Sequence, residues 1–270
     1  MYTIIEVANT HGGNIDYLLS LIDEFVDFKE EIGIKFQPFK YNEIALEDFE
    51  WYPVYEKLYF DEGQWSKIIS KASETKEVWL DIFDSYGIET LKNNLKNISG
   101  LKFQTSVLDN QPVLNNLRDV DLKDKKLIIN IAGRELSDIK SKIIFFEDNY
   151  NFEEILLEVG FQAYPTNLVD SGLLKIKEIK KNFDNRTVFA DHIDGKDINT
   201  KILPLIALQS GADVIEKHIM HSSLHTEYDH FSSIDINVFK ELMTLMKDYD
   251  VLKEQPFINK NEQDYFNKTS

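Results

Sequence analysis

The sequence contains no cysteine among its 270 residues. A disulfide framework, a zinc site with thiolate ligands and a cysteine nucleophile are therefore all excluded. Basic residues are also scarce, because 30 Lys and Arg stand against 47 Asp and Glu, giving a formal net charge of −17. This balance argues against binding to a nucleic-acid backbone or an anionic membrane surface, so we expect neither as a partner. A small anion can still bind through a local cluster of basic groups.

Long apolar runs are missing as well. No stretch approaches the ~20 apolar residues that a membrane-spanning helix needs. Residues 1–6 lack the basic and apolar regions of a secretory signal, so we expect a cytoplasmic protein. Hydrophobic residues nevertheless make up 43% of the chain, which is enough for a large core.

Short apolar runs alternate with longer amphipathic segments, which is typical of a parallel sheet with crossover helices. We expect eight strands, at 3–7, 33–37, 78–83, 101–105, 127–132, 155–160, 188–191 and 214–218. An open doubly wound sheet gives the same alternation, but eight units in about 250 residues favour an α/β fold of the (β/α)8 TIM-barrel type. We expect the barrel domain to span residues 1–252 and a polar C-terminal tail to span residues 253–270.

Helices are predicted between these strands from apolar residues spaced three and four apart. The clearest are at 15–25, 84–97, 168–182, 200–209 and 236–249. The aromatic-rich segment 41–67 is less regular, and we interpret it as a long loop with one short helix.

Polar residues stand at or near the ends of most of the apolar runs. They are Glu6, Lys35, Gln37, Asp81, Lys102, Asn130, Gln162, Asp191, His192, Glu216, Lys217 and His218. The C-terminal ends of barrel strands surround the active site, and a charged group enclosed there needs a partner or a ligand. This convergence predicts a binding or catalytic site at one end of the barrel.

Two histidines and two lysines in this set suggest specific chemistry. His192 and His218 each end a strand, and two imidazoles completed by water and a substrate oxygen suit a divalent metal such as Mn²⁺ or Mg²⁺. Lys35 and Lys102 lie inside apolar strands. Their charges require a partner, which is either a bound phosphate or carboxylate or a neighbouring Asp or Glu.

Several motifs in this order resemble those of N-acetylneuraminate synthases and of the related pseudaminic and legionaminic acid synthases. The similarity runs from about residue 4 to residue 242. The matching segments are Glu6-Val7-Ala8-Asn9-Thr10-His11-Gly12-Gly13, Lys35-Phe36-Gln37, Tyr164-Pro165-Thr166, Asp191-His192, Ile215-Glu216-Lys217-His218 and Asp229-His230. The last two segments, at this spacing and after Tyr-Pro-Thr, are the most specific.

The resemblance implies a metal-dependent transferase that forms a carbon–carbon bond between phosphoenolpyruvate and an N-acyl amino sugar or a related aldose. It implies His192 and His218 as metal ligands, and Glu6, Glu216 and His192 as catalytic residues. Substrate contacts are implied for Lys35, Gln37, Asp81, Lys102, Thr105, Gln162, Tyr164, Asp191, Lys217, Asp229 and His230.

The sequence departs from the family pattern mainly where the family binds phosphate. Leu80-Asp81-Ile82-Phe83 replaces a Ser-Thr-Pro-Phe motif, and an ionised Asp81 would repel a phosphate. The catalytic Glu of the family's Ser-Gly-Glu motif is absent from Thr105-Ser106-Val107. A C-terminal antifreeze-like domain of the family is also missing, so its role is expected either to come from a homodimer or another partner chain or to be absent.

Three functions remain open at this point. The first is a synthase with a rebuilt phosphate site. The second is a metal-dependent lyase or aldolase that acts on a sugar acid without phosphoenolpyruvate. The third is a non-catalytic barrel that binds a sugar or a partner protein.

Overall fold

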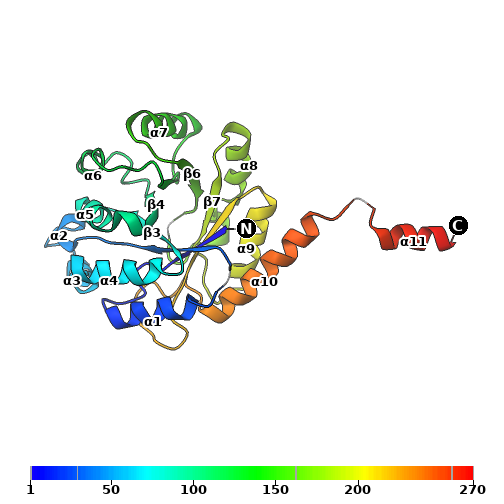
Figure 1. Ribbon diagram of the computed structural model, residues 1–270, viewed down its shortest axis with the longest axis horizontal. Helices are drawn as coiled ribbons and strands as arrows, with labels where there is room; N and C mark the ends of the chain where they lie inside the picture. The colour runs from blue at the N-terminus through cyan, green and yellow to red at the C-terminus, as the bar shows by residue number, and fades with distance from the viewer. Residues whose placement is uncertain (1, 29, 162, 257, 270) are drawn as a thin grey trace.

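A closed barrel of eight parallel strands forms the centre of the molecule, with helices around it (Figure 1). The structure, a computed structural model, describes residues 2–28, 30–161, 163–256 and 258–269. The strands are β1 (Tyr2–Glu6), β2 (Ile32–Phe36), β3 (Glu77–Ile82), β4 (Ile98–Phe103), β5 (Lys126–Asn130), β6 (Glu154–Val159), β7 (Thr187–Asp191) and β8 (Val214–His218). Each strand pairs with its neighbours in sequence, and β8 pairs with β1. The predicted (β/α)8 barrel is confirmed.

The outer layer consists of helices that follow the strands, and all but the last of them connect one strand to the next. They are α1 (Ile15–Phe25), α4 (Glu62–Ser73), α5 (Ser85–Asn94), α6 (Gln111–Leu117), α7 (Leu136–Asn149), α8 (Leu173–Asn182), α9 (Asn199–Gln209) and α10 (Ile236–Lys253). Two short helices, α2 (Tyr41–Ile44) and α3 (Tyr52–Leu58), lie between β2 and α4, and α11 (Lys260–Thr269) follows α10.

Two helix predictions were wrong. The segment 41–67 contains α2, α3 and the start of α4, whose first turn is fixed by a capping box between Asp61 and Gln64. The helix predicted at 168–182 begins only at Leu173. Gly172 has a φ of 73°, a left-handed conformation that cannot continue a right-handed helix, and a 3₁₀ turn precedes it.

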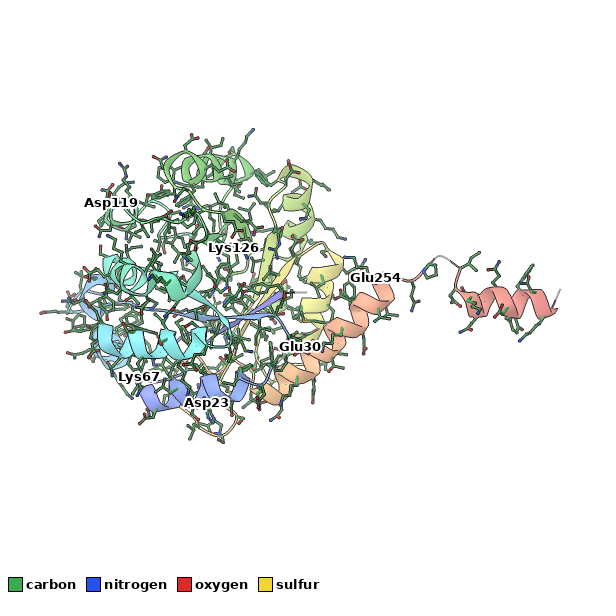
Figure 2. All side chains as sticks on the ribbon, viewed as in Figure 1. Asp23, Glu30, Lys67, Asp119, Lys126 and Glu254 are labelled. Carbon is green, nitrogen blue, oxygen red and sulfur yellow. The ribbon has the colours of Figure 1, made fainter. Side chains whose placement is uncertain are left out.

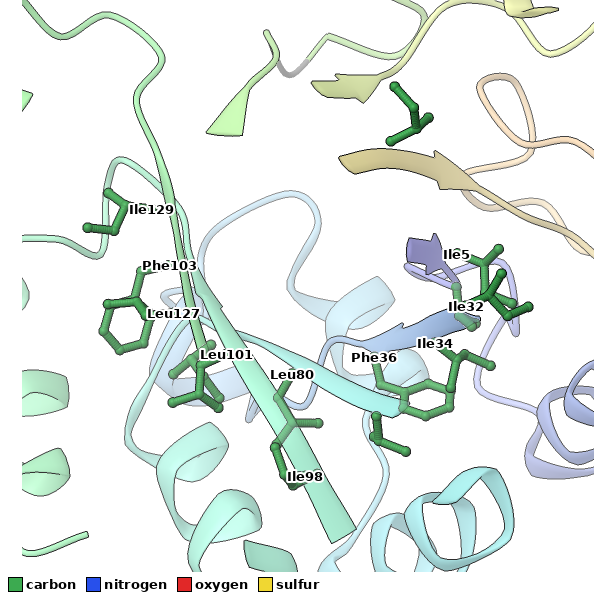
Figure 3. Close-up of a cluster of buried hydrophobic side chains, with 14 of the residues drawn as sticks. Ile5, Ile32, Ile34, Phe36, Leu80, Ile98, Leu101, Phe103, Leu127 and Ile129 are labelled. Atoms are coloured by element: carbon green, nitrogen blue, oxygen red, sulfur yellow. The ribbon is translucent and has the colours of Figure 1, made fainter. Parts of the chain in front are cut away.

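Apolar side chains fill the space on both sides of the barrel wall. The larger core lies between strands and helices, and Figure 3 shows part of it, including Ile34, Leu80 and Phe103. A smaller cluster fills the lower interior of the barrel with Ile4, Trp79, Ile128, Leu156, Val188 and Val214. Because side chains alternate between the two faces of a strand, this cluster identifies which residues point inward.

The C-terminal segment lies apart from the barrel. Helix α10 runs to Lys253, four residues beyond its predicted end, and α11 stands away from the other elements (Figure 1). Charged side chains such as Asp23, Lys67 and Glu254 cover the outside of the molecule (Figure 2). A search of the described residues finds no helix that is both long and apolar enough to span a membrane.

Candidate functional site

The barrel interior becomes polar above the apolar cluster. We call the residues there the polar layer, and each comes from a different strand: Glu6, Lys35, Asp81, Lys102, Asn130, Glu158 and Glu216. All seven are at most 1% exposed. A buried charge is tolerated only when it is paired or hydrogen-bonded, so the partners within this layer decide what it can bind.

Both lysines of the polar layer are paired with carboxylates. Lys35 contacts Glu216, and its Nζ lies 3.0 Å from Oε2 of Glu6. The Nζ of Lys102 lies 2.8 Å from Oε1 of Glu158 and 2.9 Å from Oε1 of Glu216. Asp81 is further from Lys102, with 3.8 Å between Oδ2 and Nζ. The sequence predicted either a bound anion or a neighbouring Asp or Glu as the partner of each lysine. The structure shows acidic side chains in contact with both lysines.

Four carboxyl groups therefore surround two lysines, which leaves an excess of acidic groups. Burial favours the neutral form of Glu216, but Lys102 and Lys35 outweigh it and hold its pKa well below the ordinary value. Burial raises the pKa of Glu6 to about 8 and that of Glu158 to about 7, against the attraction of the lysines. Protonation of Glu6 and Glu158 therefore reduces the excess of negative charge, and the carboxyl groups of the polar layer titrate as a coupled set.

Amide side chains complete the polar layer. Nε2 of Gln104 donates to Oδ2 of Asp81 over 2.6 Å, and Nδ2 of Asn130 donates to Oε1 of Glu158 over 2.8 Å. Glu158 was not among the predicted site residues. The pattern that would have identified it is an acidic residue two positions before the end of the predicted strand 155–160, just as Glu216 lies two positions before the end of the predicted strand 214–218.

Two histidines lie together at the upper end of the barrel. His192 follows β7 and His218 ends β8, and their ring centroids are 4.8 Å apart. The ring of Tyr164 lies 5.2 Å from that of His192 and 5.6 Å from that of His218. We call His192 and His218 the imidazole pair. The predicted convergence of these two side chains is present in the structure.

The imidazole pair has the properties of a metal-binding pair. Each histidine is 2% exposed, and Nδ1 and Nε2 of His192 and Nδ1 of His218 have no hydrogen-bond partner within the described part of the chain. Burial lowers the pKa of His192 to about 3 and holds that of His218 well below its ordinary value, so both rings stay neutral with free lone pairs. The described residues contain no group of three or more His, Cys, Asp or Glu suited to a metal, so water or substrate would complete the coordination.

A pocket of about 460 Å³, here called the mouth pocket, reaches the imidazole pair through Tyr164, which lines it and contacts both rings. It is lined by Asn9, Gln37, Phe39, Ile44, Trp51, Val54, Tyr55, Leu58, Phe83, Gln104, Tyr164, Tyr228 and Asp229. Three predicted substrate-binding residues, Gln37, Tyr164 and Asp229, are therefore brought together here. The carboxylate of Asp229 accepts a hydrogen bond from the backbone N–H of Asn9 over 2.9 Å.

The remaining predicted residues have different surroundings. Nζ of Lys217 lies 2.6 Å from Oδ2 of Asp191, so the two form an ion pair. Both residues alternate along their strands with residues that point into the barrel, so their side chains face the helix layer instead. The hydroxyl of Thr105 accepts from Nε of Arg134 over 2.9 Å. The ring of His230 packs on Phe231 with 4.1 Å between centroids. Gln162 lies outside the described residues.

Comparisons with known proteins agree with the fold and the motifs. A family model described as the NeuB family matches residues 29–255. An uncharacterized protein of Methanocaldococcus jannaschii is 25% identical over 243 residues, which cover 90% of this chain and 68% of that protein. The pseudaminic acid synthase of Helicobacter pylori is 33% identical over 138 residues, which cover 50% of this chain and 38% of the synthase.

A solved structure gives the same fold over almost the whole chain. The N-acetylneuraminic acid synthetase of Leptospira borgpetersenii, in complex with citrate, has a TM-score of 0.81 at 23% identity over 98% of this chain and 90% of its own. This likeness shows the architecture. Because the family model matches well over half of the sequence, from residue 29 to residue 255, the chain belongs to the NeuB family.

Proposed function

We propose that this protein is a metal-dependent sugar-acid synthase that condenses phosphoenolpyruvate with an N-acyl amino sugar or a related aldose. The observation that supports it best is the buried imidazole pair, three of whose nitrogens have no hydrogen-bond partner among the described residues, next to a pocket of sugar size. Membership of a family that contains pseudaminic and legionaminic acid synthases supports the same reaction class.

The proposed reaction forms one carbon–carbon bond and releases one phosphate. C3 of phosphoenolpyruvate bonds to the aldehyde carbon of the open-chain sugar, and the aldehyde oxygen takes up a proton to become a hydroxyl. Water adds at C2, and inorganic phosphate leaves. A divalent ion such as Mn²⁺ or Mg²⁺, held by His192 and His218, would supply Lewis-acid polarisation of the aldehyde oxygen.

The chain's own residues would bind and orient the two substrates. Gln37 and Asp229, which line the mouth pocket, would hydrogen-bond sugar hydroxyls. Lys35 and Lys102 would stabilise the anionic groups of phosphoenolpyruvate. The protonated fraction of Glu6, whose burial raises its pKa to about 8, can supply a proton near the reacting atoms.

The carboxylates around the lysines favour a second candidate function. Glu158 and Glu216 already neutralise Lys102, and both lysines are at most 1% exposed, so a phosphate must enter a layer with excess acidic groups. Aldol cleavage or formation of a related sugar acid needs no phosphate site. This reaction would use the imidazole pair and the mouth pocket without phosphoenolpyruvate.

The decisive experiment measures phosphate release from phosphoenolpyruvate with Mn²⁺ and a panel of N-acyl amino sugars and plain aldoses. Release with at least one sugar is expected. Absence of release with every sugar, together with production of pyruvate from a sugar acid, would establish the second function instead.

Metal binding supplies an independent check of the imidazole pair. Titration calorimetry with Mn²⁺ is expected to show binding to the wild type, loss of binding in His192→Ala, and unchanged binding in His225→Ala, which replaces an exposed histidine. A wild-type protein that binds no metal would contradict both enzyme functions and leave the non-catalytic barrel.

A further inference from the structure

We infer that a second pocket, at the opposite end of the barrel from the imidazole pair, binds a small organic acid that carries one carboxylate on an apolar body. We call it the lower pocket. It has a volume of about 450 Å³ and is lined by Tyr2, Ile4, Phe28, Glu30, Glu31, Ile32, Thr75, Lys76, Glu77, Trp79, Lys126, Leu156 and Arg186. This inference goes beyond the proposed function and does not depend on it.

The apolar interior of the barrel separates the lower pocket from the reacting centre. Ile4, Trp79 and Leu156 line the lower pocket and also belong to the apolar cluster in the lower interior, whose members are at most 2% exposed. On β1, for example, Ile4 stands between Tyr2 of the lower pocket and Glu6 of the polar layer. The described linings of the lower pocket and the mouth pocket share no residue. A ligand in the lower pocket therefore cannot react with a substrate at the imidazole pair.

Two cations form a basic side of the lower pocket. Lys126 begins β5 and Arg186 directly precedes β7. Each stands two positions before a residue of the apolar cluster, Ile128 or Val188, so both side chains point into the barrel. Glu154 is the partner of Lys126 in the strand register, but its Oε2 lies 3.3 Å from Nη1 of Arg186. One carboxylate thus serves two cations, and one positive charge remains for a ligand.

Lys126 differs in this respect from the lysines at the upper end of the barrel. Lys35 and Lys102 each contact two carboxylates, whereas Lys126 has no ion pair and no side-chain hydrogen bond within the described ranges. Carboxylates are abundant in this chain, with 47 Asp and Glu against 30 Lys and Arg. A half-buried ammonium that lacks one, in a pocket within the usual small-molecule range of roughly 300–1,000 Å³, favours an anionic ligand.

The side of the lower pocket next to β2 and β3 is acidic and limits the ligand to one negative charge. Glu77 accepts a hydrogen bond from the hydroxyl of Tyr2 over 2.6 Å, and Glu30 contacts Lys247. Glu31 also lines the pocket. These carboxylates would repel a second anionic group on the ligand, such as a second carboxylate or the second charge of a phosphate ester.

Apolar side chains between the charged sides favour an apolar body. Ile4 and Leu156 are buried, and the half-buried ring of Phe28 is held by Phe25 and Phe239, with 6.3 and 5.3 Å between ring centroids. A hydrocarbon or aromatic group in contact with these residues is removed from water, which favours binding.

The test uses the three tryptophans of the chain as reporters of different sites. Trp79 lines the lower pocket and donates its indole N–H to Tyr2, Trp51 lines the mouth pocket, and Trp65 is buried in α4. NMR spectra of isotope-labelled protein resolve their indole N–H signals, which Trp51→Phe and Trp79→Phe assign. Titration with phenylacetate is expected to shift the Trp79 signal to saturation and to leave the other two in place.

Two matched probes measure the charge requirement. Phenylacetamide has nearly the same shape as phenylacetate without its charge, and phenylmalonate carries a second carboxylate. We expect both to bind about tenfold more weakly than phenylacetate, because the first lacks a charge-assisted hydrogen bond and the second brings an extra anion close to Glu77.

Substitution of Lys126 tests the residue that carries the inference. Lys126→Gln is expected to weaken phenylacetate binding about tenfold. Lys126→Arg keeps the charge and should retain binding, which separates a lost contact from a misfolded barrel. Lys123→Gln is the matched control, because the side chain of Lys123 is 74% exposed, precedes the same strand and does not line the pocket.

The inference would be overturned by an unmoved Trp79 signal, by equal affinities for phenylacetate and phenylacetamide, or by unchanged binding in Lys126→Gln. A shift of the Trp51 signal alone would place the anion in the mouth pocket and overturn it as well. Failure of the synthase proposal would leave all of these measurements unchanged, since none of them involves phosphoenolpyruvate or a sugar.

Discussion

At the scale of single residues, Asp81 is the carboxyl group of the polar layer that would most directly oppose the phosphate of the proposed substrate. Its Oδ2 lies 3.8 Å from Nζ of Lys102 and accepts from Gln104, and it is fully buried. Removing one negative charge about 4–6 Å from a bound anion is worth roughly 1–4 kcal/mol at the effective dielectric constant of a protein site. Asp81, which stands at the threonine position of the family's Ser-Thr-Pro-Phe motif, would therefore reduce the affinity for phosphoenolpyruvate, the proposed substrate.

We accordingly predict that Asp81→Asn and Asp81→Ser bind phosphoenolpyruvate about tenfold more tightly than the wild type. Titration calorimetry measures the effect, and Asp109→Asn, which removes an exposed carboxylate, serves as the control for net charge. Equal or weaker binding in both Asp81 variants would mean that the phosphate does not approach this carboxylate.

Residue patterns predicted much of the candidate site. The position of Lys35 and Lys102 inside apolar strands predicted that both charges need a partner, and the strand ends predicted that His192 and His218 converge, as they do in the structure. The sequence does not encode pairing geometry directly, so the contacts of the two lysines with Glu6, Glu158 and Glu216 were identified only in the structure. Lys217 lies between Glu216 and His218, which both point into the barrel. Because successive side chains of a strand point to opposite faces, Lys217 points to the helix layer.

At the scale of elements, the lower interior of the barrel depends on two glycines that make room for one indole. A Cβ on Gly100 would lie 2.3 Å from Cζ3 of Trp79, and one on Gly33 would lie 2.7 Å from its Nε1. The indole N–H donates to the hydroxyl of Tyr2 over 2.7 Å, which fixes the orientation of the ring. The packing of β2, β3 and β4 inside the barrel therefore depends on one side chain, Trp79, and on the absence of side chains at Gly33 and Gly100.

We predict that Gly100→Ala lowers the free energy of unfolding by about 1–3 kcal/mol, because the added methyl overpacks this cluster. In a Trp79→Leu background the same substitution should cost clearly less. Urea unfolding of the four proteins in this double-mutant cycle measures the coupling. Equal costs in both backgrounds would show that Gly100 is required for its backbone conformation instead.

Element types were predicted more reliably than element boundaries. All eight strands begin within three residues of their predicted starts, because buried parallel strands are continuous apolar runs. The region 41–67 was harder to predict since its helices α2 and α3 are short and pack through aromatic contacts, such as that of Tyr41 with Tyr52, which have no sequence period. This is the same segment that forms the aromatic side of the mouth pocket.

At the scale of the whole molecule, the closed barrel and its helices form one body, and the residues after α10 stand apart from it (Figure 1). In α11, Tyr265 is 72% exposed and Phe266 is 68% exposed, and no buried core residue lies beyond Met246 among those described. Because stability depends mainly on apolar area removed from water, this segment contributes little to folding of the barrel.

Deletion of residues 255–270 should therefore change the melting temperature of the protein by no more than about 1 °C, since surface changes of this kind are worth within about 0.5 kcal/mol. Differential scanning calorimetry at two protein concentrations makes the test specific. A fall of several degrees at both concentrations would mean that α11 packs on its own barrel. A fall only at the higher concentration would mean that it stabilises an assembly of chains, because binding between copies raises stability by mass action. A fall only at the higher concentration would also explain the exposed aromatic residues of α11, because it would mean that α11 packs on the barrel of a neighbouring chain.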